Sequence, residues 1–229
     1  MHEYLPMTKI KSYETQKDHL RENLTKYTRK AFQMIPEFDN LDILDVGCGR
    51  GVPTMELARL SKGQITGLDI NQTFLDELTK KIKDAGLSNR VRTMRCSMLE
   101  MDFPAESFDL IWAEGSIWRI GFERGLKEWR RFLKPNGFLA VHDDVVDLEK
   151  KLRKIPHSGY KPLGHFIVPS DAWRLEYYGP LERLIQDVRA EHTDDPKALD
   201  LLDKDQQEVA VFKTNPEIYG SVFLMMQKA

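Results

Sequence analysis

The sequence predicts an α/β protein with a doubly wound, mostly parallel sheet of seven strands. Short apolar runs alternate with segments of helical periodicity along most of the 229 residues, and this alternation is typical of such sheets. A glycine-rich turn joins the first apolar run directly to a helix, which indicates a strand, a tight turn and a helix in succession. The predicted strands are residues 41–46, 64–70, 91–96, 108–113, 137–141, 160–168 and 219–227.

The first strand is followed by the clearest turn in the chain. Gly47, Gly49 and Gly51 come at every second position, and Pro53 stands where a first helical turn begins. Glycine accepts positive φ and carries no Cβ that would hold a ligand away from the backbone, and proline suits the first turn of a helix. The turn therefore offers backbone amides and a helix amino end to a polar or anionic ligand.

The spacing of this turn limits what it binds. The third glycine comes one residue earlier than in the G-x-G-x-x-G turn of dinucleotide sites, and the lysine and hydroxyl of a P-loop are absent. A ligand without a pyrophosphate is therefore expected. The second strand brings Asp69 to its end, where a carboxylate can accept hydrogen bonds from two ribose hydroxyls.

The residues DVGCGRG at 45–51, with Asp69 ending the next strand, resemble the first two motifs of the class I S-adenosylmethionine-dependent methyltransferases. FDLIWA at 108–113 is similar to the fourth strand of that family, 122–133 to its next helix, and LKPNGFLAV at 133–141 to its lysine-proline-glycine turn and fifth strand. The resemblance implies an antiparallel last strand, S-adenosyl-L-methionine as cofactor, and methyl transfer that leaves S-adenosylhomocysteine.

The same resemblance implies which residues hold the cofactor. Asp45 and the glycine turn would hold its methionine part, and Asp69 its ribose. Many relatives have an acid at the position of Ser97, and the serine hydroxyl can accept the same hydrogen bond from the adenine. The predicted cofactor-binding residues are Asp45, Gly47, Cys48, Gly49, Gly51, Asp69, Ile70, Ser97, Met98 and Glu114.

Two strand ends carry candidate catalytic groups. His142 follows the fifth strand and is the candidate general base, because histidine takes up a proton near neutral pH; a hydrogen-bonded structural role is the alternative. Glu114 ends the fourth strand, where it would hold the cofactor, attract a cationic acceptor or cap the next helix. Asp143 and Asp144 lack a third ligand at a recognisable spacing, so no metal is predicted.

Two further segments resemble parts found in some members of that family, namely a leading segment that folds over the cofactor and extra helices that cover the active site. Residues 1–38 are predicted to be an N-terminal helical lid, with irregular chain up to Tyr13 and one amphipathic helix from Leu20 to Ile35; a packing helix is the alternative. Residues 169–214 are predicted to be a helical insertion that covers the active site.

The insertion is expected to be broken at Gly179 and Pro180. Its aromatic residues are either pocket walls or core. The predicted substrate pocket consists of Tyr4, Trp118, His142, Trp173, Tyr177 and Tyr178. The whole chain is expected to be one methyltransferase domain, with a cofactor-binding core at 39–168 and a closing strand within 215–229.

Composition limits the partners. The 34 basic and 36 acidic residues nearly cancel, so nucleic acid is not an expected partner. The longest apolar run, 222–226, is too short for a membrane span, and two cysteines are too few for a disulfide framework. A soluble, cytoplasmic protein with a small-molecule methyl acceptor is expected. The oligomeric state stays open, with a homodimer as one option.

Three alternative functions remain open. An NAD-dependent oxidoreductase would use the same strand, turn and helix. An RNA-directed methyltransferase would use the basic residues late in the segment 122–133, although no stacking aromatics accompany them. A cofactor-binding module without turnover is the third. The Asn-Pro-Pro-Tyr type signature of base amino methylation is absent, which disfavours DNA amines.

Overall fold

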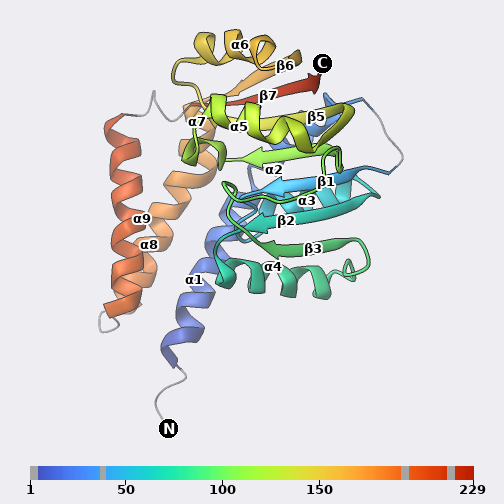
Figure 1. The fold of residues 1–229 in the computed structure, drawn as a ribbon. Helices are drawn as coiled ribbons and strands as arrows, with labels where there is room; N and C mark the ends of the chain where they lie inside the picture. The colour runs from blue at the N-terminus through green and yellow to red at the C-terminus, as the bar shows by residue number, and fades with distance from the viewer. Residues whose placement is uncertain (1–4, 37–39, 192–195, 216–219) are drawn as a thin grey trace. The chain divides into compact units, whose positions relative to one another are not determined.

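The computed structural model describes residues 5–36, 40–191, 196–215 and 220–229. The chain forms two units: Met1–Leu24 with Val168–Gly220, and Thr25–Ile167 with Ser221–Ala229. The second unit holds the sheet, and the first is helical in its described part (Figure 1). The N-terminal segment is therefore divided between the two units.

The sheet has seven strands in the order β3-β2-β1-β4-β5-β7-β6 (Figure 1). The strands from β3 to β5 in this order all pair in parallel. Strand β7 pairs with β5 in the antiparallel direction. The predicted doubly wound sheet with an antiparallel last strand is confirmed. The strands are β1 Asp42–Val46, β2 Gln64–Asp69, β3 Val91–Arg95, β4 Phe108–Glu114, β5 Leu133–Asp144, β6 Tyr160–Val168 and β7 Ser221–Lys228.

Helices cover both faces of this sheet. Successive side chains of a strand point to opposite faces, and in β1 Leu44 belongs to the core shared with the helix that contains Leu126, whereas Asp45 bonds to Thr54 of another helix. These two helices therefore lie on opposite faces. The helices of this unit are α2 Thr25–Gln33, α3 Val52–Leu60, α4 Gln72–Asp84, α5 Phe122–Trp129 and α6 Leu148–His157, with 3-10 turns η1 Ile117–Arg119 and η2 Arg130–Phe132.

Glycine, proline and asparagine occupy the backbone conformations that these residue types favour. Gly47, Gly49 and Gly51 all have positive φ, at 72°, 52° and 84°. Pro53 stands in the first turn of α3, and Asn136 near the start of β5 has positive φ, which asparagine tolerates better than most residues. Backbone strain in the turn between β1 and α3 is thus avoided by residue type alone.

Strand β5 is longer than predicted. The expectation was residues 137–141, but the strand runs from Leu133 to Asp144 and includes His142. His142 pairs with Phe223 of β7, and Asp144 pairs with Ser221. The pairing partner lies about eighty residues further along the chain, so local sequence could not indicate the extension.

The N-terminal prediction was wrong in two respects. Helix α1, Leu5–Glu22, already occupies the segment expected to be irregular, and α2 is a separate helix. The buried side chains of α1 include Tyr13 and Asp18. Because these buried residues carry polar groups, the sequence of this helix does not show the continuous apolar stripe by which an amphipathic helix is recognised.

The insertion contains α7 Ser170–Trp173, a π-helical turn η3 Arg174–Tyr178, α8 Gly179–Glu191 and α9 Pro196–Thr214. The predicted break at Gly179 and Pro180 is not present, because a π-turn leads directly into α8. Proline lacks the N–H that would bond to the carbonyl four residues back, here Glu176. The amide of Asn23 donates to that carbonyl instead, at 3.1 Å, so the helix passes through the proline.

None of the helices in the described part of the chain is long and apolar enough to cross a membrane.

Candidate functional site

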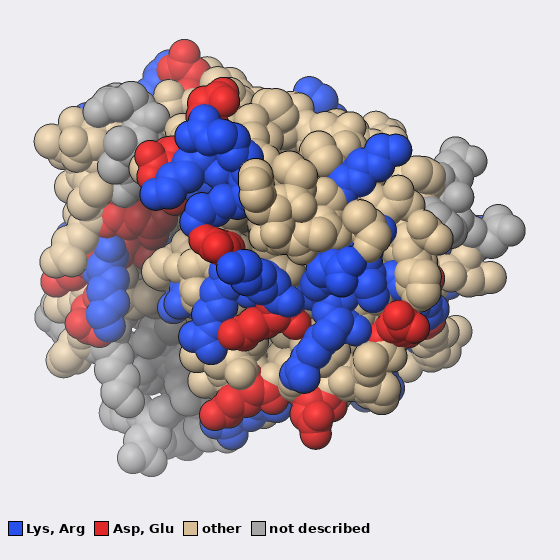
Figure 2. Space-filling model, turned by 45° about the horizontal axis from the view of Figure 1, so that its top comes forward, with Lys and Arg blue, Asp and Glu red and all other residues tan. Residues whose placement is uncertain are grey.

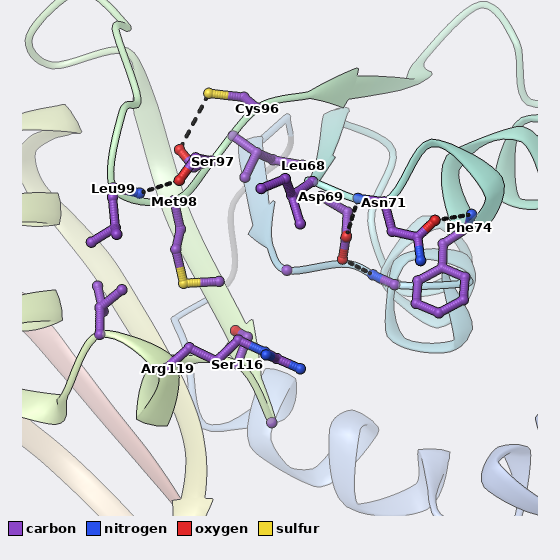
Figure 3. A pocket seen from close by; sticks show the side chains of 15 residues that line it. Leu68, Asp69, Asn71, Phe74, Cys96, Ser97, Met98, Leu99, Ser116 and Arg119 are labelled. Atoms are coloured by element: carbon purple, nitrogen blue, oxygen red, sulfur yellow. Dashed lines mark hydrogen bonds between the residues drawn. The ribbon is translucent and has the colours of Figure 1, made fainter. Parts of the chain in front are cut away.

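A cavity of about 470 Å³ opens beyond the carboxyl ends of β1, β2, β3 and β4. Parallel sheets bind their ligands at this edge, and the volume is in the range of small-molecule sites. Figure 3 shows the side chains that surround it. The lining residues are Gly47, Gly49, Leu68, Asp69, Ile70, Asn71, Phe74, Cys96, Ser97, Met98, Leu99, Gly115, Ser116, Arg119 and Ile120.

The carboxylate of Asp69 is held by backbone amides at this cavity. Gly49 donates its N–H to Oδ2 at 2.9 Å, and Asn71 donates to Oδ1 at 2.8 Å (Figure 3). Each oxygen keeps a second lone pair that can accept a further hydrogen bond. The glycine turn and the start of α4 therefore fix the orientation of an acceptor pair that faces the cavity.

The loop after β3 forms another wall. The hydroxyl of Ser97 accepts the N–H of Leu99 at 3.2 Å, so its own proton remains available to a ligand. Leu99 and Ile70 are about half to two thirds exposed, at 49% and 66%. These exposed apolar side chains, with Met98, give the cavity surfaces that suit the faces of a flat ring.

Asp45 lies beneath the glycine turn rather than in the cavity lining. It is 1% exposed, and its Oδ2 accepts the hydroxyl of Thr54 at 2.6 Å. Burial raises the pKa of Asp45 to about 7; the bond from Thr54 opposes this rise, and the charges of Glu114 and Asp69 add to it. Its predicted contact with a methionine part stays a prediction.

Two other residues of the predicted set stand behind the turn. Cys48 is buried, and burial raises the pKa of its thiol, so it remains protonated. A Cβ on Gly51 would lie 2.1 Å from the side chain of Leu78. Gly51 thus serves the packing of the turn on α4, whereas Gly49 has nothing within 4 Å of its Cβ position and lines the cavity.

Glu114 is engaged by two neighbouring elements. Its carboxylate accepts the hydroxyl of Thr28 in α2, at 3.0 Å, and the indole N–H of Trp112, at 3.1 Å. The residue at the cap position of the 3-10 turn that follows is Ser116 and not Glu114. Glu114 therefore ties α2 to the end of β4, and its predicted contact with cofactor or acceptor stays a prediction.

His142 is enclosed by the sheet. It is 5% exposed, its Nε2 lies 2.7 Å from the hydroxyl of Ser221, and its ring lies 4.4 Å from that of Phe223. His142 does not line the cavity. Neighbouring Asp143 pairs with Lys151 at 2.8 Å. A role of His142 as general base stays a prediction.

The predicted pocket aromatics fall in different places. Trp118 is 58% exposed and donates its indole N–H to Gly115, a cavity residue, at 3.0 Å. Trp173, Tyr177 and Tyr178 belong to the helical unit, where their rings contact one another with centroids 5.1–6.0 Å apart. Tyr4 lies outside the described residues.

Nine of the fifteen residues that line the cavity were not in the predicted site. They are Leu68, Asn71, Phe74, Cys96, Leu99, Gly115, Ser116, Arg119 and Ile120. Ser116 also donates to the carbonyl of Val46 at 2.5 Å, beside the glycine turn. Most of these residues lie at or just after the carboxyl end of a strand, and that position was the available signal; Phe74 instead lies in the first turn of α4.

The basic residues of α5 and α6 lie among acidic ones. Glu123 pairs with Lys127 and Lys154, and Arg124 pairs with Glu128. Hydrogen bonds from the two lysines lower the pKa of Glu123 to about 2. Figure 2 shows basic and acidic side chains interspersed on the face that it presents. Such a surface offers no continuous basic track for a nucleic-acid backbone.

Residues 43–137 match the profile of a protein family described as a methyltransferase domain. A curated relative, the sterol 24-C-methyltransferase ERG6B of Gibberella zeae, is 33% identical over 119 residues, which are 48% of this chain and 31% of that one. The chain spans less than half the length of the curated relatives it matches.

Solved structures share the fold over most of the chain. An S-adenosylmethionine-dependent methyltransferase from Geobacter sulfurreducens, in complex with S-adenosylhomocysteine, has a TM-score of 0.73 at 18% identity and covers 91% of both chains. The cyclase SpnF has a TM-score of 0.72 at 22% identity, covering 89% of this chain and 80% of that one.

The sheet order and these likenesses define a class I methyltransferase fold. Over residues 43–137 the chain is therefore similar to methyltransferase domains, and its fold is the one that the solved methyltransferase structures share.

Proposed function

We propose that this protein transfers a methyl group from S-adenosyl-L-methionine to a small-molecule acceptor and releases S-adenosylhomocysteine. The observation that carries the proposal is the Asp69 carboxylate, oriented by the amides of Gly49 and Asn71 at the edge of a cavity of about 470 Å³. A fixed pair of acceptor oxygens suits the two hydroxyls of a ribose.

The rest of the cavity fits the same nucleoside. Gly47 and Gly49 line it with positive φ and no side chain, so a ligand can approach their backbone closely. The apolar side chains of Ile70, Met98 and Leu99 suit a nucleobase, and the Ser97 hydroxyl is available to its polar edge.

The bound sulfonium would supply an electrophilic methyl group. The task left to the protein is to hold the acceptor in line with that group and to exclude water. A general base is needed only for an acceptor that must lose a proton, which agrees with a cavity lined by no histidine. His142 and Glu114 as catalytic groups belong to this proposal as predictions.

A small-molecule acceptor is supported by relatives such as the sterol methyltransferase, whose name states its substrate. The interspersed charges on α5 and α6 disfavour the RNA-directed alternative. The likeness to a cyclase favours one other candidate, a non-transferring enzyme on the same fold. An assay must therefore detect methyl transfer itself and not only binding.

The test combines calorimetry with an acceptor screen. We expect the full chain to release heat with S-adenosylhomocysteine and none with NADH. Asp69→Asn should weaken S-adenosylhomocysteine binding about 30-fold or more, because the amide cannot accept both ribose bonds. The exposed Asp84→Asn is the matched control and should bind normally.

The screen incubates the protein with a metabolite extract and S-adenosyl-L-methionine and measures S-adenosylhomocysteine. Release by the native chain, and little by Asp69→Asn, supports methyl transfer. Heat with NADH alone would establish the oxidoreductase alternative. Binding without release from any extract would support the cofactor-binding module or the cyclase-like enzyme.

The proposal includes a cytoplasmic setting. Cys48 and Cys96 are both unbridged, which fits a reducing compartment. A homodimer is the assembly that light scattering of the purified chain should test.

A further inference from the structure

Charge is sparse around the cavity. Of its fifteen lining residues, only Asp69 and Arg119 carry a full charge. Asp69 is an acceptor of hydrogen bonds already oriented by two backbone amides. Arg119 is the only cation in this lining, so it is the one side chain there that can form an ion pair with a negative group of the ligand.

Arg119 is positioned by its own turn. Its guanidinium carbon lies 4.6 Å from the centre of the Trp118 ring, a stacked cation–π arrangement. Trp118 is in turn fixed by its indole bond to the carbonyl of Gly115, and the backbone N–H of Arg119 donates to Ser116. In Figure 3 the guanidinium points into the cavity.

The acids nearest in the fold have other partners. Asp69 bonds to Gly49 and Asn71, Asp45 to Thr54, and Glu114 to Thr28. Among the side chains that the structure describes, no carboxylate forms an ion pair with Arg119. A guanidinium oriented toward a cavity without a protein carboxylate is ready for an anion from the ligand.

S-adenosylmethionine carries one anionic group at neutral pH, the α-carboxylate of its methionine part. Asp69 cannot pair with that group, since both are negative. We propose that Arg119 binds this α-carboxylate and so fixes the methionine part of the cofactor in the cavity. This inference rests on the proposed function, which by itself requires only that the nucleoside binds.

The test uses two probes in calorimetry on the full chain: S-adenosylhomocysteine and its decarboxylated analogue, which keeps the ribose and adenine but lacks the carboxylate. Arg119→Gln should weaken binding of S-adenosylhomocysteine about 10- to 50-fold, as expected for a lost charge-assisted bond. It should change binding of the decarboxylated analogue less than about 3-fold. Arg119→Lys keeps the charge without the planar fork and should give an intermediate loss.

Arg124→Gln is the matched control, because Arg124 is an ion-paired cation of α5 that does not line this cavity. It should bind both probes as the native chain does. Equal weakening of both probes by Arg119→Gln, or no weakening of either, overturns the inference while the proposed function stands. A loss that appears only with an anionic acceptor present would assign Arg119 to the acceptor and also overturns it. Failure of the native chain to bind either probe overturns both proposals.

Discussion

At the scale of single residues, the carboxyl groups near the glycine turn have different environments and therefore different roles. Asp69 is partly exposed and accepts two backbone N–H groups, which leave it suited to bind hydroxyls. Asp45 is fully enclosed and has a single hydroxyl donor, Thr54. The same residue type thus serves as ligand acceptor in one place and as a support of the turn in the other.

Asp45 predicts a pH dependence of stability. Its pKa is raised from an ordinary value near 4 to about 7 by burial, so the folded state holds the proton more tightly than the unfolded state. The stability that the folded protein gains from protonated Asp45 is complete below pH about 4 and is lost as the pH rises to about 7. Asp45→Asn cannot ionise, so its Tm relative to the native chain should rise by at least about 3 °C between pH 5 and pH 8.

Thermal unfolding of both chains at the two pH values measures this difference. The exposed Asp84→Asn is the control, and its Tm relative to the native chain should stay constant. A constant difference for Asp45→Asn as well would mean that Asp45 is ionised in the folded protein at pH 5.

At the scale of elements, the turn between β1 and α3 divides its glycines between packing and binding. All three have positive φ, but their surroundings differ. Gly51 lies against Leu78, which is fully buried, whereas Gly49 faces open space and donates to Asp69. Glycines that recur at every second position of one turn can therefore have different functions.

Two alanine variants separate these functions. Gly51→Ala should lower the free energy of unfolding by about 3 kcal/mol, since strained φ adds to overlap with Leu78. Gly49→Ala meets no neighbour, so it should lower it by only about 1 kcal/mol yet weaken S-adenosylhomocysteine binding. Urea unfolding and calorimetry provide the two readouts. The reverse ranking in urea would show that Leu78 moves aside.

At the scale of the whole molecule, the helical unit unites the start of the chain with a segment far along it. Asp205 of α9 accepts the phenol of Tyr13 and the ammonium of Lys17, both in α1 and both at 2.6 Å. Tyr13 and Asp205 are 2% and 5% exposed. Burial and the bond to Asp205 raise the pKa of Tyr13, which keeps the phenol a donor.

Removing Asp205 should release α1 from its unit. Asp205→Ala leaves a buried phenol and a largely buried ammonium unpaired, at an expected loss of about 2–4 kcal/mol. Hydrogen exchange should therefore accelerate in α1 and α9 and stay unchanged in β1 and β4. Tyr13→Phe, which removes one bond, should have a smaller effect.

Asp203→Ala supplies the matched control on the same helix. Asp203 pairs with Arg189 at 2.6 Å, but both side chains are exposed, so its loss should be under about 1 kcal/mol. Equal exchange in the Asp203 and Asp205 variants would mean that the buried network does not hold α1.

The sequence by itself determined the sheet, the conformations of the glycine turn and the place of Asp69, because these depend on neighbours in the chain and on the rule that parallel strands end at one edge. Only the tertiary structure decided the length of β5, the helix within residues 5–22 and the cavity position of Arg119. These features depend on partners far away in sequence, such as β7 for β5 and Asp205 for α1. The continuation of the helix across Pro180 also depends on a distant partner. Asn23 donates to the carbonyl of Glu176, which proline leaves without a helical donor.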